Sequence, residues 1–285
     1  MPYTRWNDLL SYLTIFVVSL LLGCARLVPF PSAKPFSQEE IAHVISHLSE
    51  QEERIVSFQG IGRLRFKEGE EDSESDLFAV GRKPFKARIE ITHPWGKPLF
   101  HIVVDESNIS VLSLTENKFF SGPSNPVNTN RFFLCGLDLD SAWKILSGRV
   151  PILPHYRAAS LRPQKISLYD RQDEVVEVIS FSHGHLLPRS VYFPKKGITI
   201  VLSEFKEGDF GPYPLKIKIV KGDEDQLVEI QYKNLQVNKP IPEEIFRLNP
   251  PPDFEIIQLN YQESQRPVRL SQADHGQALK SPPWR

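Results

Sequence analysis

The chain has 285 residues, of which 40% are hydrophobic and 24% charged, and its formal net charge is −1 at pH 7. Because cations and anions are interspersed and no basic block occurs, nothing in the composition points to a nucleic-acid partner. With only two cysteines the chain is not a disulfide-rich scaffold, so its folded part must be stabilised by burial of an apolar core. The length suits one large β domain, or one domain with tails.

The N-terminus carries an apolar run, Leu13–Leu22, after a short segment that contains Arg5 and Asp8. A transmembrane helix needs ~20 predominantly apolar residues, and this run is too short. A basic start, an apolar middle and a small residue before the cut are typical of a secretory signal peptide, here residues 1–23.

The end of that run, Leu21-Leu22-Gly23-Cys24, resembles the bacterial lipobox, in which the cysteine is acylated and becomes the first mature residue. The alternative is an ordinary signal peptide with an incidental cysteine. The resemblance implies that Cys24 carries palmitate-type chains and anchors the protein in a membrane, since two or more lipid signals give stable attachment. Ala25, rather than Asp, after the cysteine favours the outer membrane of a diderm bacterium, facing the periplasm.

Residues 24–36 are expected to form the lipidated N-terminus and a proline-rich linker, which proline keeps extended. A helix is predicted to follow, because Ser37 and Glu40 form a capping box and apolar residues then recur at helical spacing to Leu48. His43 and His47 lie four residues apart on this helix and could reach one metal ion. No third ligand accompanies them, so no metal site is predicted.

From residue 55 the period of the hydrophobic pattern changes to that of strands. Strands are predicted at 55–66, 77–81, 85–92, 99–104, 109–114, 118–121, 165–169, 175–181, 186–193, 198–205, 215–219, 227–237 and 256–259. Glu68–Glu74 is predicted to be a solvated acidic turn. A second helix is predicted at 141–146, capped by Asp138 or Asp140 and ended by Gly148, and residues 260–285 are predicted to be a disordered polar tail.

These elements predict a mainly β fold over residues 37–259, a strongly curved, incompletely closed antiparallel β-barrel with a few covering helices. Gly60 and Gly62, on one face of the first strand, indicate a bend or close packing. The interior of such a sheet either is filled by side chains or leaves an apolar cavity, and the sequence leaves both open.

The stretch from Ala87 to Phe100, with its turn His93-Pro94-Trp95-Gly96, resembles the strand–loop–strand of LolB, the outer-membrane receptor that accepts lipoproteins from the periplasmic carrier LolA. The first strand and the later helix, with Phe58-x-Gly60-x-Gly62-x-Leu64 and Trp143, also agree in order with the LolA/LolB superfamily. The pattern suits lipoproteins of the same fold with no assigned function as well. His93 in place of the family's Asn, and Trp95 in place of its projecting Leu, are departures.

The resemblance implies that acyl chains of a lipoprotein or lipid cargo are held in an apolar cup and passed to the outer membrane, with a periplasmic LolA-type carrier as a candidate partner. It implies a membrane-insertion loop at Pro94, Trp95 and Gly96. The acyl-binding candidates are apolar side chains of the strands and the later helix: Phe58, Leu64, Phe66, Ile89, Ile91 and Trp143. The alternative is a structural or accessory envelope lipoprotein, a protein-binding module with a filled core.

No motif of a known enzyme class occurs, neither Gly-x-Ser-x-Gly, His-Glu-x-x-His, a P-loop nor Cys-x-x-Cys. His183 and His185 form a turn pair without a third ligand. Asp138 and Asp140 are better explained as helix caps than as a paired acid and base. We therefore expect no catalytic residue, no metal and no cofactor, and the protein is predicted not to be an enzyme.

Overall fold

The computed structural model describes residues 34–132, 136–182, 186–222 and 225–260. The signal peptide, Cys24, most of the linker, His183, His185 and nearly all of the C-terminal tail lie outside the described residues, so the predictions made for them stay predictions. Within the described residues, no helix is both long enough and apolar enough to cross a membrane.

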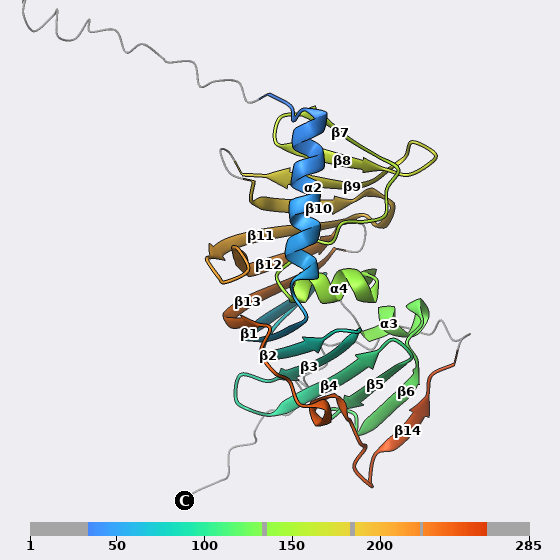
Figure 1. The fold of residues 1–285 in the computed structure, drawn as a ribbon. Helices are drawn as coiled ribbons and strands as arrows, with labels where there is room; N and C mark the ends of the chain where they lie inside the picture. Colours follow the sequence, from blue (N-terminus) through green and yellow to red (C-terminus); the bar gives the residue numbers. More distant parts are fainter. Residues whose placement is uncertain (1–33, 133–135, 183–185, 223–224, 261–285) are drawn as a thin grey trace, which may run out of the picture. The chain divides into compact units, whose positions relative to one another are not determined.

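The described strands form one 14-stranded sheet that does not close, with β14 and β7 at its two edges (Figure 1). The strand order is β14-β6-β5-β4-β3-β2-β1-β13-β12-β11-β10-β9-β8-β7. The first seven strands in chain order are β1 (Ser57–Glu68), β2 (Glu71–Arg82), β3 (Lys86–Thr92), β4 (Pro98–Asp105), β5 (Asn108–Ser113), β6 (Lys118–Pro123) and β7 (Arg157–Arg162). The others are β8 (Lys165–Tyr169), β9 (Val175–Phe181), β10 (Pro188–Phe193), β11 (Ile198–Lys206), β12 (Tyr213–Lys221), β13 (Gln226–Val237) and β14 (Glu255–Gln258).

The predicted mainly β, incompletely closed fold is confirmed, with one difference in strand direction. Neighbouring strands are antiparallel except β14, which pairs parallel to β6. The 3-10 turn η3 (Glu243–Phe246) precedes β14, and Glu243 is bound there by Arg82 and Lys86. Arg88 Nη1 donates to the carbonyl oxygen of Ile245 at 3.0 Å. These contacts hold the returning chain against β2 and β3 before it reaches the sheet edge.

The prediction that Glu68–Glu74 is a solvated turn is wrong for most of that stretch. The turn is short, and β2 begins at Glu71. Asp72 and Glu74 face basic partners across the β1–β2 hairpin, with Arg65 at 2.5 Å and Arg63 at 3.1 Å. Opposite charges on paired strands are compatible with an extended backbone, so an acidic run alone did not mark a turn.

One face of the sheet is apolar and carries the core. Ile200, Ile217, Ile219 and Ile230, from three neighbouring strands, are at most 1% exposed. The helix α2 (Gln38–Glu53) runs across strands β7 to β12, and α4 (Leu139–Leu146) lies near its end (Figure 1). The inward stripe of α2 is buried, as the periodicity predicts. The capping box is also confirmed, since the Ser37 N–H donates to Glu40 Oε2 at 2.7 Å and the Glu40 N–H donates to Ser37 Oγ at 3.2 Å.

Neither the helix α3 (Pro126–Phe132) nor the edge strand β7 was predicted. In α3 the buried residues include the polar Asn128 and Thr129, whose side chains donate to backbone carbonyl oxygens at 2.8 and 2.9 Å. In β7 only Ala159 is buried. Neither segment therefore shows the apolar period on which sequence prediction depends.

The expectation of a bend or close packing at Gly60 and Gly62 is confirmed. The pairing of β1 with β13 shifts register between Ile61 and Gly62. A Cβ on Gly62 would lie 2.2 Å from the Gln231 carbonyl oxygen, and a Cβ on Gly60 would lie 2.4 Å from the ring of Tyr232. The Tyr232 hydroxyl, inside the core, donates to the carbonyl oxygen of Leu146 at 2.9 Å. The two glycines thus let the tyrosine connect the sheet to the end of α4.

Candidate functional site

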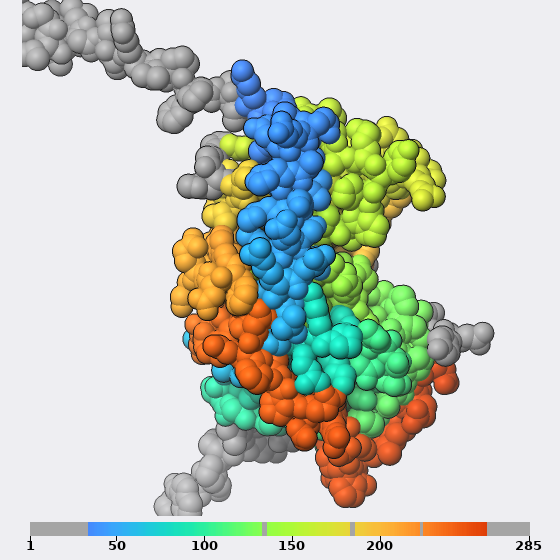
Figure 2. Space-filling view, viewed as in Figure 1, coloured from blue at the N-terminus to red at the C-terminus, as the bar shows by residue number. Residues whose placement is uncertain are grey.

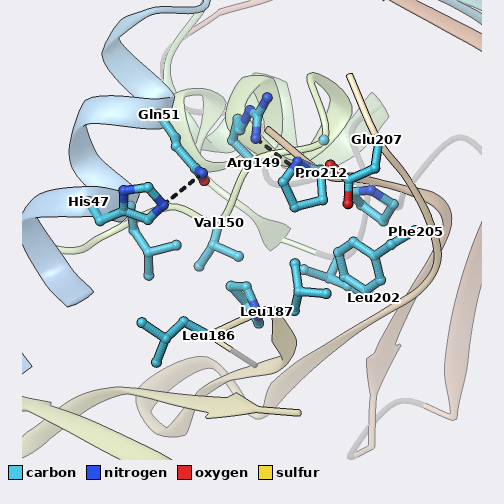
Figure 3. A pocket seen from close by; sticks show the side chains of 14 residues that line it. His47, Gln51, Arg149, Val150, Leu186, Leu187, Leu202, Phe205, Glu207 and Pro212 are labelled. Atoms are coloured by element: carbon cyan, nitrogen blue, oxygen red, sulfur yellow. Dashed lines mark hydrogen bonds between the residues drawn. The ribbon is translucent and has the colours of Figure 1, made fainter. Parts of the chain in front are cut away.

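A pocket of about 280 Å³ lies between α2, the segment after α4 and strands β10 to β12 (Figure 3). Most of its lining is apolar, and the polar or charged members are His47, Gln51, Arg149 and Glu207. The remaining lining residues are Leu48, Gly148, Val150, Leu186, Leu187, Pro188, Leu202, Phe205, Pro212 and Pro214. Several of these side chains keep contact with solvent, among them Leu186, which is 45% exposed. The pocket is therefore open to the surface.

The end of α4 positions the charged residue of the pocket. Gly148 has φ 77°, and its N–H donates to the carbonyl oxygen of Ile145 at 2.9 Å, while the Arg149 N–H donates to that of Lys144 at 2.8 Å. This is the Schellman arrangement, in which a left-handed glycine reverses the chain at the helix end. The reversal places Arg149 and Val150 directly in the pocket wall.

The side chain of Arg149 is 5% exposed. Its Nη2 donates to the carbonyl oxygen of Phe210 at 2.9 Å and its Nη1 to that of Pro212 at 3.2 Å, but its buried Nε has no partner. Within the residues the structure covers, no carboxylate forms an ion pair with it. Burial lowers the pKa of the guanidinium, although arginine stays charged in proteins.

On the opposite wall, α2 contributes His47 and Gln51, one helical turn apart. The Gln51 amide Nε2 lies 3.0 Å from His47 Nε2, and because an amide nitrogen only donates, the imidazole accepts through that atom. Gln51 also lies against the loop that binds Arg149, since a Cβ on Gly211 would lie 2.8 Å from its Nε2. Glycine at this position, with φ 86°, lets the loop approach the helix closely.

Strand β11 supplies the apolar floor. Leu202 and Phe205 are three residues apart, and in a regular strand they would point to opposite faces. Both line the pocket, because Glu204 between them has φ 55° and interrupts the alternation. The Glu204 side chain accepts from Gln231 Nε2 at 2.8 Å. The local break in the strand therefore adds an aromatic side chain to the pocket.

None of the six residues predicted to bind acyl chains lines this pocket. Phe66 is half-buried and packs against the core, and the other five are at most 6% exposed within it: Phe58, Leu64, Ile89, Ile91 and Trp143. The rings of Phe58 and Trp143 meet edge-on with centroids 5.3 Å apart. These side chains belong to the core cluster or pack against it, and their role in acyl binding stays a prediction.

The loop between β3 and β4 presents Trp95 to solvent, with 92% of the residue exposed. The His93 N–H donates to the carbonyl oxygen of Lys97 at 2.8 Å, which closes the turn. Gly96 occupies the left-handed region at φ 84°, and the rings of His93 and Trp95 lie 5.0 Å apart. Trp95 therefore contacts its neighbour in the loop and does not pack on the sheet.

A second buried titratable side chain lies on β9, outside the pocket lining. Glu177 on β9 is 0% exposed, its Oε2 accepts from the Leu153 N–H at 2.9 Å, and its Oε1 has no partner. Burial raises the pKa of this carboxyl to about 8, opposed by the hydrogen bond from Leu153 and by the charge of Lys144. At neutral pH Glu177 is therefore protonated.

The described residues contain no cluster of three or more His, Cys, Asp or Glu side chains that could hold a metal ion. His43 and His47 stack with ring centroids 6.4 Å apart. Asp138 caps α4, its carboxylate accepting from the Ser141 N–H at 2.9 Å, while Asp140 binds Lys144 at 2.7 Å. The prediction of a helix cap is therefore confirmed for Asp138, whereas Asp140 lies in the first turn of α4 and is not its cap.

The sequence analysis missed the residues that make the pocket. It considered His47 only as a metal ligand, and it did not single out Arg149, Leu202 or Phe205. One signal was present, because Gly148 marks a helix end and Arg149 is a charge directly before the apolar stretch from Val150. Phe205 could not be found, since it depends on the backbone break at Glu204.

Among solved structures, the fold is similar to that of a LolA superfamily protein from Nitrosomonas europaea, at 13% identity and a TM-score of 0.49, covering 72% of this chain and 97% of that one. A putative outer membrane lipoprotein-sorting domain from Vibrio parahaemolyticus matches at 11% identity and 0.47, covering 72% and 94%. The Mycobacterium tuberculosis lipoprotein LppX matches at 12% and 0.33, covering 72% and 99%. These likenesses concern the fold alone.

No protein-family model matches the chain, and no curated protein matches it either. The functional argument therefore depends on the chain's own residues.

Proposed function

We propose that this chain is a lipoprotein of the bacterial envelope, anchored through Cys24 in the outer membrane, that holds an acyl chain of a lipid or lipoprotein cargo in the pocket beside α2 and passes it to the membrane. The observation that carries the proposal is the open pocket with a mainly apolar lining beside α2. An acyl chain entering such a pocket leaves water, which stabilises the complex by roughly 0.8 kcal/mol per CH₂ group.

The size of the pocket limits the cargo. At about 280 Å³ it is slightly smaller than the ~300–1,000 Å³ typical of small-molecule sites. It suits a segment of one acyl chain rather than all the chains of a triacylated lipoprotein together. The proposed cargo is therefore held by one chain, which also keeps binding weak enough for release.

Leu186→Asp is expected to reduce acyl binding at least about tenfold, because a carboxylate at the pocket mouth must lose water when the chain enters. Leu186 is 45% exposed, so the free energy of unfolding should change little. The measurement is labelling of the full chain by a photoreactive palmitoyl analogue, with the crosslinked peptides identified by mass spectrometry. Leu161→Asp on β7, where Leu161 is 76% exposed and outside the pocket, is the matched control. Equal labelling of the two variants would refute the pocket as the acyl site.

Trp95→Glu is expected to slow transfer of a bound fluorescent acyl probe to acceptor vesicles severalfold, because a tryptophan ring is favoured at the membrane interface and a carboxylate is not. With Trp95 92% exposed, the unfolding free energy should stay within about 0.5 kcal/mol of that of the unchanged chain. Trp95→Phe should keep most of the transfer rate. Unchanged transfer by Trp95→Glu would remove the loop from the proposed function.

A second candidate function is a protein-binding module. It is favoured by two exposed apolar side chains at the β7 edge, Tyr156 at 77% and Leu161 at 76% exposed, since edge strands with exposed apolar residues are sites of association. Extraction of the full chain from its own membranes separates the two candidates. An acyl species recovered with the chain, and lost in Leu186→Asp, supports the lipid carrier; a protein recovered instead, and lost in Leu161→Asp, supports the module.

A further inference from the structure

The pocket has a polar end and an apolar end. Figure 3 shows Gln51, Arg149, Pro212 and Glu207 together at one end, while Leu186 and Leu187 lie at the other. A ligand that fills it must present a polar group beside an apolar chain. This arrangement matches an amphiphile whose head lies among the polar side chains.

The polar end contains the exposed carboxylate of Glu207 and a buried cation, Arg149, that forms no ion pair among the described residues. Arg149 is only 5% exposed, and its guanidinium donates to two backbone carbonyl oxygens. Its Nε is buried with no acceptor. A buried cation and a buried unsatisfied N–H both cost free energy unless an acceptor compensates them. An oxyanion that reaches the guanidinium from the pocket would compensate the buried charge.

We propose that the pocket is selective for acyl chains that carry an anionic oxygen head, a carboxylate or a phosphate, and that Arg149 binds this head. The inference rests on the proposed acyl-binding function and names the chemical class of its ligand. Arginine suits the role because its planar guanidinium presents several N–H donors to one oxyanion.

The other charged or polar residues of the lining determine whether Arg149 is free to bind an anionic head group. Glu207 lines the same pocket but is exposed and forms no ion pair with Arg149 among the described residues. It therefore does not compensate the buried charge, and it opposes an anionic ligand through like-charge repulsion. Gln51 directs one amide N–H at His47 and keeps a second, but the amide is neutral. Arg149 is therefore the lining residue with a permanent positive charge for an anionic head group.

The test uses the full chain in dodecyl maltoside, an uncharged detergent that competes equally in every arm. Photoreactive analogues of palmitate, palmitoyl-lysophosphatidate, methyl palmitate and monopalmitoylglycerol are titrated, and the labelling of pocket peptides is followed. Palmitate and its methyl ester share one chain and differ in charge. The carboxylate and phosphate arms identify which head the pocket prefers. The variants are Arg149→Gln, Arg149→Lys and Glu207→Gln, each checked for unfolding temperature.

For the unchanged chain, half-maximal labelling by one or both anionic analogues should need about tenfold less ligand than labelling by the neutral ones, the effect of a charge-assisted hydrogen bond. Arg149→Gln should abolish this preference while neutral labelling persists, Arg149→Lys should keep part of it, and Glu207→Gln should increase it. If Arg149→Gln fails to fold, two other results test the inference. These are the labelling of the unchanged chain by palmitate compared with its methyl ester, and the increase in the preference for anionic analogues in Glu207→Gln.

Equal labelling by charged and neutral analogues overturns the inference and leaves the proposed function standing. A preference for anions that survives in folded Arg149→Gln overturns it as well. Absence of pocket labelling by all four analogues contradicts the proposed function itself, and the inference with it.

Discussion

Replacing Trp143 by alanine is expected to lower the free energy of unfolding by about 3–5 kcal/mol, the cost of deleting a large buried aromatic side chain. Trp143 is 3% exposed, meets Phe58 edge-on at 5.3 Å, and has the ammonium of Lys83 5.5 Å from its ring centroid. The backbone at Gly81 packs directly against the indole, since a Cβ there would lie 2.7 Å from the indole nitrogen. We expect these closely packed neighbours to move little, so that the substitution leaves a cavity.

The measurement is urea unfolding of the full chain followed by circular dichroism. Trp95→Ala is the control, because it removes the same side chain from a position that is 92% exposed and should change stability by no more than about 0.5 kcal/mol. The sequence resemblance implied that Trp143 binds acyl chains. That role would instead be supported if Trp143→Ala kept its stability and lost labelling by the palmitoyl analogue.

Two strands, Lys165–Tyr169 and Val175–Phe181, have in the structure the same bounds as in the prediction. In the first, buried Ile166 and Leu168 alternate with polar residues, a pattern that can be recognised without knowledge of the partner strand. The second has Glu177 on its buried face, so it was its richness in Val and Ile, rather than alternation, that marked it as a strand. Strand 77–81 was predicted too short, since its N-terminal half is charged and is extended only because β1 supplies Arg63 and Arg65 across the hairpin. A short window of sequence does not show that a charged segment pairs with opposite charges on another strand.

The pocket was not predictable for a related reason. Its lining comes from α2, the segment after α4 and three strands, which only the sheet order brings together. The burial of Arg149 depends on the loop carbonyls of Phe210 and Pro212, more than sixty residues further along. Sequence reasoning identified apolar side chains correctly but could not tell which ones face each other and which remain open to a ligand.

Glu177→Gln is expected to stabilise the protein above neutral pH by a few kcal/mol and to leave it nearly unchanged near pH 4.5. The pKa of Glu177 is raised by burial from 4.5 to about 8 in the folded chain. Between these two values the unfolded chain releases this proton and the folded chain retains it, so the stability of the unchanged protein falls as pH rises through the window and levels off above about pH 8. Glutamine has no proton to lose, and its carbonyl oxygen can still accept from the Leu153 N–H.

The test compares unfolding free energies of the two chains at intervals from pH 4.5 to 9. Other groups titrate over this range, among them Glu52, whose pKa is also raised by burial, but they are common to both chains and cancel in the difference. A flat difference for Glu177→Gln would mean that the Glu177 carboxyl ionises in the folded chain as readily as in the unfolded one. Its unpartnered Oε1 would then have to be solvated, so water would reach the buried face of β9.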